Sequence, residues 1–247
     1  SLEGKNAIVT GGNTGLGQAF SLALAKAGAN VMMPSIMPDD PEFTALIEAE
    51  GVRACYLACD LTEPGVPRKV VDECATTFGS VDILVNSAGA CKNRLFQEYG
   101  RTEWDPMVAI NLTAAFDMST EAGRHFIDQR SGKIIKICSL YSFLGGKRSP
   151  AYAATKHGIV GLTKAFCDEL AEYNVQVNGI APGYFKTKLV EETMSSPERN
   201  AWIVAHTPDG HLGEMYDLMG VTVFLASDAS RFVNGHILTV DGGYLIR

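Results

Sequence analysis

The sequence predicts an α/β protein in which a doubly wound parallel sheet carries helices on both faces. Short apolar runs alternate with longer segments of helical periodicity along all 247 residues. The runs DILV at 82–85 and KIIKIC at 133–138 are apolar at nearly every position, which is typical of strands buried on both faces. Because no linker, repeat or compositional boundary interrupts the alternation, we expect a single domain over residues 1–247.

Each expected element has its own local signal. Strands are indicated by short runs rich in Val, Ile and other apolar residues that end in Gly, Ser or Pro, and helices by apolar residues three and four apart. The expected strands are 5–12, 29–36, 53–61, 80–89, 132–142, 174–183 and 236–243. The expected helices are 17–28, 42–51, 67–79, 104–127, 149–172 and 216–227. The polar stretch between the last two helical patterns reads as irregular.

Composition excludes several classes of protein. The net charge of −7 argues against a nucleic-acid partner, since phosphate binding needs a clustered basic face. No apolar run approaches the ~20 residues that span a bilayer, and the first residues lack the basic start and apolar run of a signal peptide. The six cysteines form no C-x-x-C pair and have no accompanying His cluster. We therefore expect a reduced, cytoplasmic protein with no membrane partner and no metal site.

A glycine-rich turn follows the first expected strand. The stretch TGGNTGLG at 10–17 has the spacing G-x-x-x-G-x-G and leads directly into a helix. Glycines let the backbone approach a ligand, and the helix N-terminus attracts a pyrophosphate. A tight structural turn is the alternative, but the position at a strand-to-helix junction favours a nucleotide. The expected contacts are Gly11, Asn13, Thr14, Gly15, Leu16 and Gly17.

A tyrosine and a lysine share one face of the helix expected from 149. Tyr152 and Lys156 are four residues apart, and the residues between them are the small Ala153, Ala154 and Thr155. A phenol with its ordinary pKa of ~10 is a poor base near neutrality, and a neighbouring ammonium lowers that value. The alternative is a closely packed helix that carries both residues for structural reasons. Ser139, at the end of the preceding strand, adds a hydrogen-bond donor for a substrate oxygen.

These motifs together resemble the short-chain dehydrogenase/reductase family over nearly the whole chain. They are TGGNTGLG at 10–17, NSAG at 86–89, Asn111 in INLT, Ser139 in KICSL, Tyr152 with Lys156, and PGYFKT at 182–187. The resemblance implies a Rossmann-like fold and hydride transfer between a nicotinamide cofactor and a secondary alcohol or ketone. The implied catalytic residues are Ser139, Tyr152, Lys156 and Asn111.

The resemblance also assigns roles to single residues. Tyr152 would be the general acid/base, Lys156 would also bind the nicotinamide ribose, Ser139 would orient the substrate, and Asn111 would support a proton relay through water. Further implied cofactor contacts are Asp60, Leu61, Asn86, Ala88, Gly89, Pro182, Gly183 and Thr187. Ser87 stands where the family usually has Asn, which removes one supporting hydrogen bond.

The residues at the end of the second expected strand indicate whether NAD or NADP binds. An acid there selects NAD, but this chain has Ser35. No Lys or Arg occurs from 31 to 38 to hold a 2′-phosphate, and Asp39 and Asp40 would repel one. We therefore expect NAD, with the use of both NAD and NADP as the alternative.

Cations near the expected pocket favour a small anionic substrate. Lys92, Arg94, Lys147, Arg148, Lys186 and Lys188 all follow strand ends in this acidic protein. We expect Lys92, Arg94 and above all Arg148 to bind substrate, together with Ser139, Tyr152 and Tyr184. The stretches NTGLGQ, GGKRSPAY and IAPGYFKT are most similar to sugar-acid dehydrogenases, such as gluconate 5-dehydrogenase and 2-dehydro-3-deoxy-D-gluconate 5-dehydrogenase.

Some alternatives stay open at this point. A 3-oxoacyl-thioester reductase would share every catalytic residue, and a nucleotide-sensing regulator would share the fold. Residues 189–217 are expected to form a lid over the substrate. The resemblance implies a homotetramer that uses the helices at 104–126 and 152–172.

Overall fold

Seven parallel strands form one sheet in the order β3-β2-β1-β4-β5-β6-β7. The computed structural model describes residues 1–187 and 196–247. The strands are β1 (Asn6–Val9), β2 (Asn30–Ser35), β3 (Ala54–Ala58), β4 (Ile83–Asn86), β5 (Gly132–Ile137), β6 (Val175–Pro182) and β7 (Ile237–Val240). Each pairs in parallel with its neighbours in the sheet. The expected doubly wound α/β sheet is confirmed.

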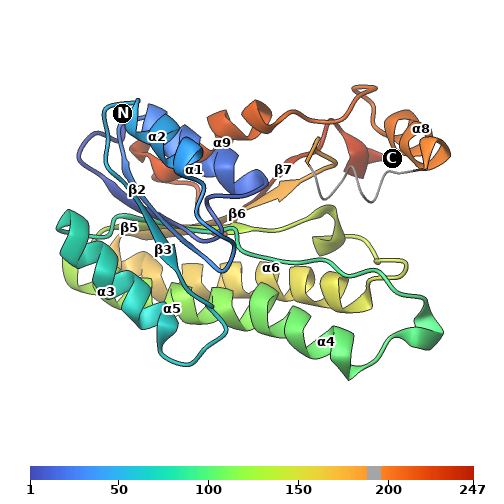
Figure 1. Cartoon of the computed structure of the whole chain (residues 1–247), viewed down its shortest axis with the longest axis horizontal. Helices are drawn as coiled ribbons and strands as arrows, with labels where there is room; N and C mark the ends of the chain where they lie inside the picture. The colour runs from blue at the N-terminus through green and yellow to red at the C-terminus, as the bar shows by residue number, and fades with distance from the viewer. Residues whose placement is uncertain (188–195) are drawn as a thin grey trace.

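Helices cover both faces of this sheet. They are α1 (Leu16–Lys26), α2 (Pro41–Glu48), α3 (Val66–Phe78), α4 (Arg101–Val108), α5 (Ala114–Gln129), α6 (Pro150–Leu170), α8 (Pro197–His206) and α9 (Met219–Ala226). Figure 1 shows α1, α2 and α9 above the sheet and α3, α5 and α6 below it. Among the described helices, none carries an apolar stretch long enough to cross a membrane.

The alternation of side chains along the strands builds a separate core on each face. Ala7 and Val9 of β1 belong to the cluster under α1, α2 and α9, which contains Phe20. Ile8 between them points to the opposite cluster under α3, α5 and α6, which contains Phe126. The same alternation recurs in β2 and β4. The continuous apolar runs in the sequence therefore exist because both faces of these strands are buried.

The order of the strands reverses direction at the boundary between β1 and β4. The chain first winds outward through β2 and β3, and then crosses back to continue with β4, β5, β6 and β7. Ligands of such sheets bind beside the carboxyl ends of the strands at this switch point. The glycine turn after β1, the NSAG stretch after β4, and Ser139 after β5 all lie at that edge.

One expectation about the helices is refined and another is wrong. Residues 104–127 are helical as expected, but a π-helical turn at Ala109–Thr113 (η2) separates α4 from α5. Pro106 removes a backbone donor inside α4, and the amide of Ala114 reaches back five residues to the carbonyl of Ala109. In addition, the stretch expected to be irregular contains α8, whose first turn is capped because Ser196 Oγ accepts from the amide of Arg199 at 3.3 Å.

Candidate active site

The glycine turn has the backbone geometry of a phosphate loop. Gly11 and Gly15 have positive φ values of 63° and 51°, which favour glycine. A Cβ on Gly17 would stand 2.1 Å from the carbonyl oxygen of Gly11, so no side chain fits there. Gly15 precedes α1 and supplies no side-chain cap. Its carbonyl accepts from the amide of Gln18 at 3.2 Å, and the two amides before Gln18 are left for a ligand.

The hydroxyl of Thr10 anchors the glycine turn to a neighbouring loop. Thr10 Oγ1 accepts hydrogen bonds from the amides of Ser87 and Ala88, both at 2.9 Å. This joins the loop after β1 to the loop after β4 through backbone amides. Thr10 stands first in the quoted TGGNTGLG stretch, but the sequence pattern did not reveal its bridging role.

Two buried amide oxygens in this region fit a polar ligand. Asn13 donates from Nδ2 to the carbonyl of Pro38 at 2.8 Å, and Asn86 donates from Nδ2 to Ser119 Oγ at 3.0 Å. Within the described residues, the Oδ1 atoms of Asn13 and Asn86 have no hydrogen-bond partner. An unpaired buried acceptor is costly. A dinucleotide lying along the sheet edge offers hydroxyl and amide donors of the kind that these oxygens lack.

The other expected cofactor residues lie along the same edge. Ser35 ends β2 and is buried, and its Oγ accepts from the amide of Met37 at 3.1 Å. Asp60 accepts from the amide and the hydroxyl of Thr62 at 2.8 and 2.7 Å, and these bonds hold the pKa of Asp60 below its usual value. The remaining members of the set are Thr14, Leu16, Leu61, Gly89, Pro182, Gly183 and Thr187; Thr187 is the last residue described before the gap at 188–195.

Ser139 and Tyr152 come together from two elements. Ser139 follows β5, and its Oγ accepts from the amide of Tyr141 at 3.2 Å. Tyr152 lies in the first turn of α6, and its ring contacts Tyr141 edge-on at 5.8 Å between centroids and 82° between planes. Burial raises the pKa of Tyr152, and its hydrogen bond with the Ser139 side chain opposes that rise. The net direction is opposite to the one expected from Lys156 alone, because desolvation dominates.

Lys156 is buried beside this pair. Its Nζ donates to the carbonyl of Ile137 at 2.6 Å and lies 5.5 Å from the centroid of the Tyr152 ring. The carbonyl of Lys156 accepts from Ser142 Oγ at 2.9 Å, and the same hydroxyl accepts from the amide of Ser139 at 3.1 Å. Burial lowers the pKa of Lys156. Ser142, which sequence reasoning missed, therefore ties α6 to the end of β5.

Asn111 occupies the π-helical turn and is buried. Its Oδ1 accepts from the amide of Ala90, and its Nδ2 donates to the carbonyl of Ala90, both at 2.8 Å. Nδ2 also donates to Thr155 Oγ1 at 3.4 Å. Asn111 thus holds the loop after β4 against α6. Single π turns of this kind occur frequently at functional sites.

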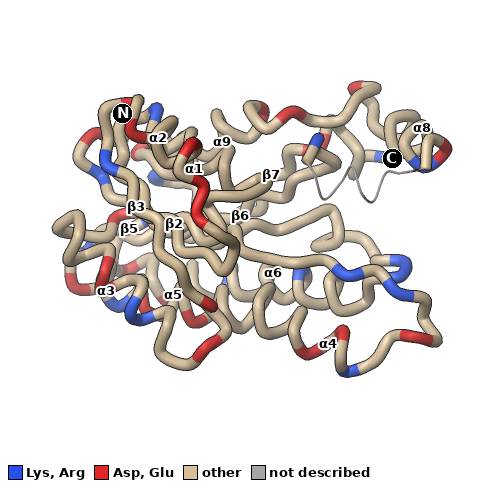
Figure 2. Tube along the Cα trace, in the orientation of Figure 1, with Lys and Arg blue, Asp and Glu red and all other residues tan. Residues whose placement is uncertain are grey.

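The expected substrate cations differ in how they are paired. Lys92 and Arg94 lie 3.6 and 4.0 Å from the carboxylate of Glu103, and Lys186 pairs with Glu214. Arg148 is exposed and has a left-handed backbone (φ 69°), and its carbonyl accepts from the amide of Arg94 at 2.9 Å. Figure 2 shows Lys and Arg along the loops at this end of the molecule. Lys188 falls outside the described residues, and the substrate role of the others stays a prediction.

The family model for short chain dehydrogenases matches residues 5–198. This span contains the glycine turn, Asn111, Ser139, Tyr152 and Lys156. The chain belongs to the short-chain dehydrogenase/reductase family. It is therefore an NAD(P)-dependent oxidoreductase that acts on CH–OH groups, and its relatives are named as dehydrogenases and reductases.

Relatives of this chain match it from end to end. The uncharacterized oxidoreductase YgcW of Escherichia coli (strain K12) is 56% identical, covering 100% of this chain and 95% of the relative. The 2-dehydro-3-deoxy-D-gluconate 5-dehydrogenase of the same strain is 43% identical and covers 100% and 98%. A solved gluconate 5-dehydrogenase from Burkholderia cenocepacia J2315, in complex with NADP and tartrate, is 35% identical, with a TM-score of 0.93 and coverage of 100% and 97%.

Proposed function

We propose that this short-chain dehydrogenase/reductase interconverts the alcohol and ketone of a sugar acid of the gluconate or 2-dehydro-3-deoxygluconate type. The supporting observation is the exposed Lys147 and Arg148 a few residues before Tyr152 in an acidic protein, because a local positive field attracts an anionic substrate. The sugar-acid dehydrogenases among the full-length relatives support the same substrate class. So does tartrate, a hydroxy dicarboxylate, in the Burkholderia structure.

Tyr152 transfers the proton, and Ser139 and Lys156 assist it. In the direction of oxidation, the Tyr152 oxygen accepts the carbinol proton while Ser139 donates a hydrogen bond to the same substrate oxygen and fixes its position. In the direction of reduction, the Tyr152 hydroxyl returns the proton. Lys156, held by the carbonyl of Ile137, places a positive charge near the phenol that favours its ionised form. The nicotinamide cofactor, when bound, accepts or supplies the hydride.

NAD is the cofactor that the end of β2 supports best. Asp40 caps α2 by accepting from the amide of Phe43 at 3.0 Å, and its second oxygen lies 3.4 Å from Gln18 Nε2 on α1. A carboxylate is thereby turned toward the helix that follows the glycine turn, and residues 30–40 contain no Lys or Arg. A 2′-phosphate would find repulsion there and no cationic partner. Because solved relatives bind NADP, the preference of this chain for NAD over NADP is to be measured directly.

The test is a panel of substrates assayed with both cofactors. The purified protein is mixed with NAD or NADP and sugar acids or polyols, and with the reduced cofactors and 2-dehydro sugar acids or 3-oxoacyl thioesters. We expect turnover of a sugar acid with a higher kcat/KM for NAD than for NADP. Turnover confined to thioesters with NADPH would identify an oxoacyl reductase. Cofactor binding without any turnover would indicate a nucleotide-sensing regulator.

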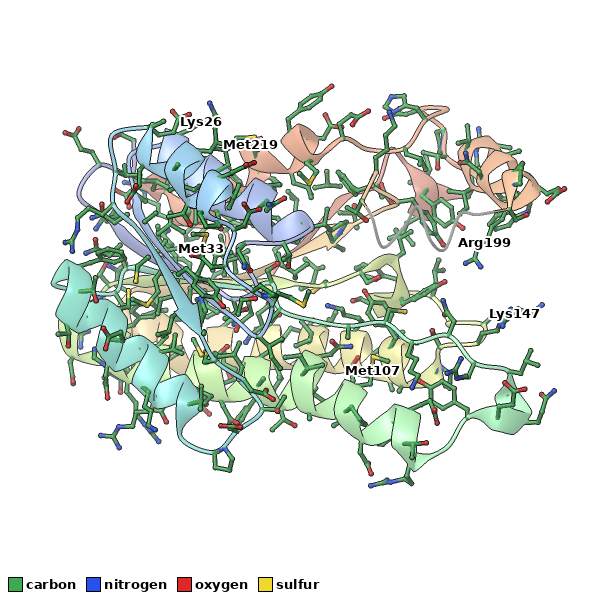
Figure 3. All side chains as sticks on the ribbon, in the orientation of Figure 1. Lys26, Met33, Met107, Lys147, Arg199 and Met219 are labelled. Carbon is green, nitrogen blue, oxygen red and sulfur yellow. The ribbon has the colours of Figure 1, made fainter. Side chains whose placement is uncertain are left out.

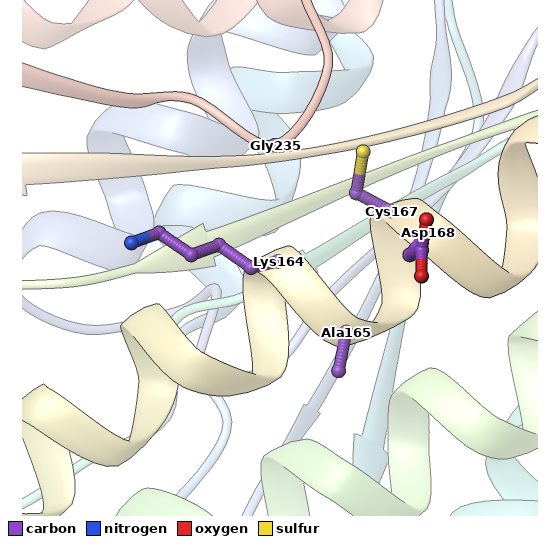
Figure 4. Close-up of a pocket in the computed structure, with 5 residues that line it drawn as sticks. All are labelled: Lys164, Ala165, Cys167, Asp168 and Gly235. Carbon is purple, nitrogen blue, oxygen red and sulfur yellow. The ribbon is translucent and has the colours of Figure 1, made fainter.

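The proposal includes a homotetramer in the cytoplasm, built through the outer faces of α5 and α6. A hollow of 440 Å³ lies there between Leu112, Thr113, Phe116, Gly158, Gly161 and Leu162. Phe116 is 44% exposed, and a Cβ on Gly161 would meet nothing, so another helix could approach closely. A second hollow on α6, lined by Lys164, Ala165, Cys167, Asp168 and Gly235, contains no catalytic residue (Figure 4). A monomeric mass by light scattering would contradict this assembly.

A further inference from the structure

Arg199 on α8 is a cation that the motif analysis did not single out. Figure 3 shows its side chain extending from α8 toward the side of the molecule that carries Lys147. Among residues 1–187 and 196–247, its guanidinium forms an ion pair with no carboxylate. This distinguishes it from Lys92 and Arg94, which share Glu103. With no carboxylate partner among the described residues, the guanidinium keeps its capacity to bind an anion.

The charge of Arg199 lowers the pKa of side chains in three separate segments. Burial raises the pKa of Cys91, Tyr184 and Tyr244, and in each case the Arg199 guanidinium opposes that rise. Lys156 acts on Cys91 in the same direction as Arg199. Cys91 therefore lies close enough to both Lys156 and Arg199 for each charge to affect its pKa. The loop after β4 is thus within the electrostatic reach of Arg199 on α8.

A row of phenol rings leads from Tyr152 to Tyr184 and Tyr244, the two tyrosines whose pKa values Arg199 lowers. Tyr152 contacts Tyr141 edge-on at 5.8 Å between centroids, and the Tyr141 and Tyr184 side chains are hydrogen-bonded. Tyr184 in turn contacts Tyr244 at 5.4 Å and 64°. The row supplies hydroxyl groups from Tyr152 to Tyr244, whose pKa Arg199 lowers. A polyhydroxylated chain with an anionic end matches this sequence of groups.

We propose that Arg199 binds the substrate carboxylate, so that α8 determines the preference for acids over neutral polyols. This inference rests on the proposed sugar-acid function. A planar guanidinium pairs with a carboxylate through two parallel hydrogen bonds, and the hydroxyls of Tyr184 and Tyr244, within its electrostatic reach, would orient the same ligand. Oxidation at C5 of an aldonic acid places the carboxylate four carbon–carbon bonds from the reacting carbon. The carboxylate must therefore be held away from Ser139 and Tyr152, on the side where Arg199 lies.

The test compares an acid with the neutral polyol of the same chain length in variants of Arg199. Arg199→Met keeps the backbone amide that Ser196 caps, so α8 stays intact. We expect the KM for the sugar acid to rise about 10- to 100-fold while kcat changes little. The kinetic constants for the polyol should stay unchanged. Arg199→Lys should recover part of the loss, because lysine retains the charge without the fork.

Two further variants make the outcome decisive. Arg68→Met, an exposed arginine on α3 that pairs with Asp72, is the matched control and should behave as wild type. Equal losses with acid and polyol in Arg199→Met, or an acid-selective loss in Arg148→Met instead, would overturn the inference while sugar-acid turnover by the wild type stood. A wild type that oxidises only polyols would refute the proposed function and the inference together.

Discussion

Replacing Tyr152 by Phe should reduce kcat by about 10²- to 10⁴-fold, the range that general acid–base catalysis contributes. Phenylalanine keeps the ring that packs edge-on against Tyr141 and removes only the hydroxyl that transfers the proton. Ser139 and Lys156 keep their backbone partners, so cofactor binding should persist. The measurement is steady-state turnover of the best substrate in the panel, with the dissociation constant for NADH taken from its fluorescence.

A tyrosine outside the site provides the control for this variant. Tyr173 ends the short helical turn after α6, and the Arg130 guanidinium stacks on its ring at 5.5 Å from the centroid. Tyr173→Phe should retain wild-type turnover. If Tyr152→Phe kept more than about a tenth of the wild-type kcat, the proton would have another carrier, since the loss would fall below the general acid–base range.

The pH dependence of the wild type follows from the same group. Oxidation needs the ionised phenol, and burial raises the pKa of Tyr152. The rate of oxidation should therefore increase with pH until the phenol is ionised, and the rate of reduction should decrease over the same range. The positive charges of Lys156 and of an oxidised nicotinamide lower the pKa in the complex. The profile of Tyr152→Phe should lack this ionisation.

The sequence revealed those parts of the site that depend on local geometry. Gly11, Gly15 and Gly17 are needed because a turn must have positive φ and close backbone contacts, and such requirements leave a readable pattern. Tyr152 and Lys156 share a face because of helical spacing. The alternation of strands and helices predicted the sheet because strands buried on both faces must be apolar.

Other parts of the site depend on contacts between distant segments. Asn111 lies in a π turn that helical periodicity could not reveal, because the turn inserts one residue and is supported by bonds to Ala90 on another loop. Arg199 lies in a stretch without a motif, and its proposed role comes from its electrostatic effect on Cys91, Tyr184 and Tyr244. No local pattern records a neighbour that is remote in the sequence.

Lys136 is a further residue, inside the core, whose contacts the sequence pattern could not reveal. In the sequence it interrupts the apolar run KIIKIC, and the structure buries it fully in β5. Its Nζ donates to the hydroxyl of Ser119, which also accepts from Asn86 Nδ2 and donates to the carbonyl of Ala115 at 2.6 Å. The ammonium lies 4.7 Å from the centroid of the Phe166 ring. Ser119 is the single side-chain acceptor described for a group with three donors, so the charged form is poorly compensated.

This burial couples the stability of the protein to pH. Desolvation lowers the pKa of Lys136 from 10.5 to about 7, and a nearby Cys138 thiolate would oppose the shift. Between pH 7 and 10.5 the unfolded state therefore binds more protons than the folded state, and the free energy of unfolding increases with pH through this group. Below pH 7 both states are protonated, and the full cost of burying the charge remains. Each pH unit within the window contributes about 1.4 kcal/mol.

Lys136→Met should remove this dependence. Methionine fills the space beside Phe166 without a charge, and Asn86 still donates to Ser119. We expect the variant to be more stable than wild type at pH 6.5, and the difference to shrink by about 3 kcal/mol by pH 9, two units above the folded pKa. Urea unfolding at pH 6.5 and pH 9 measures this difference in the free energy of unfolding. Lys69→Met, at an exposed position on α3, is the control. The difference between wild type and variant isolates Lys136, because the other titrating groups are common to both. Curves that stay parallel from pH 6.5 to 9 would show that Lys136 keeps its proton inside the fold, and that the Ser119 hydroxyl and the Phe166 ring compensate the buried charge.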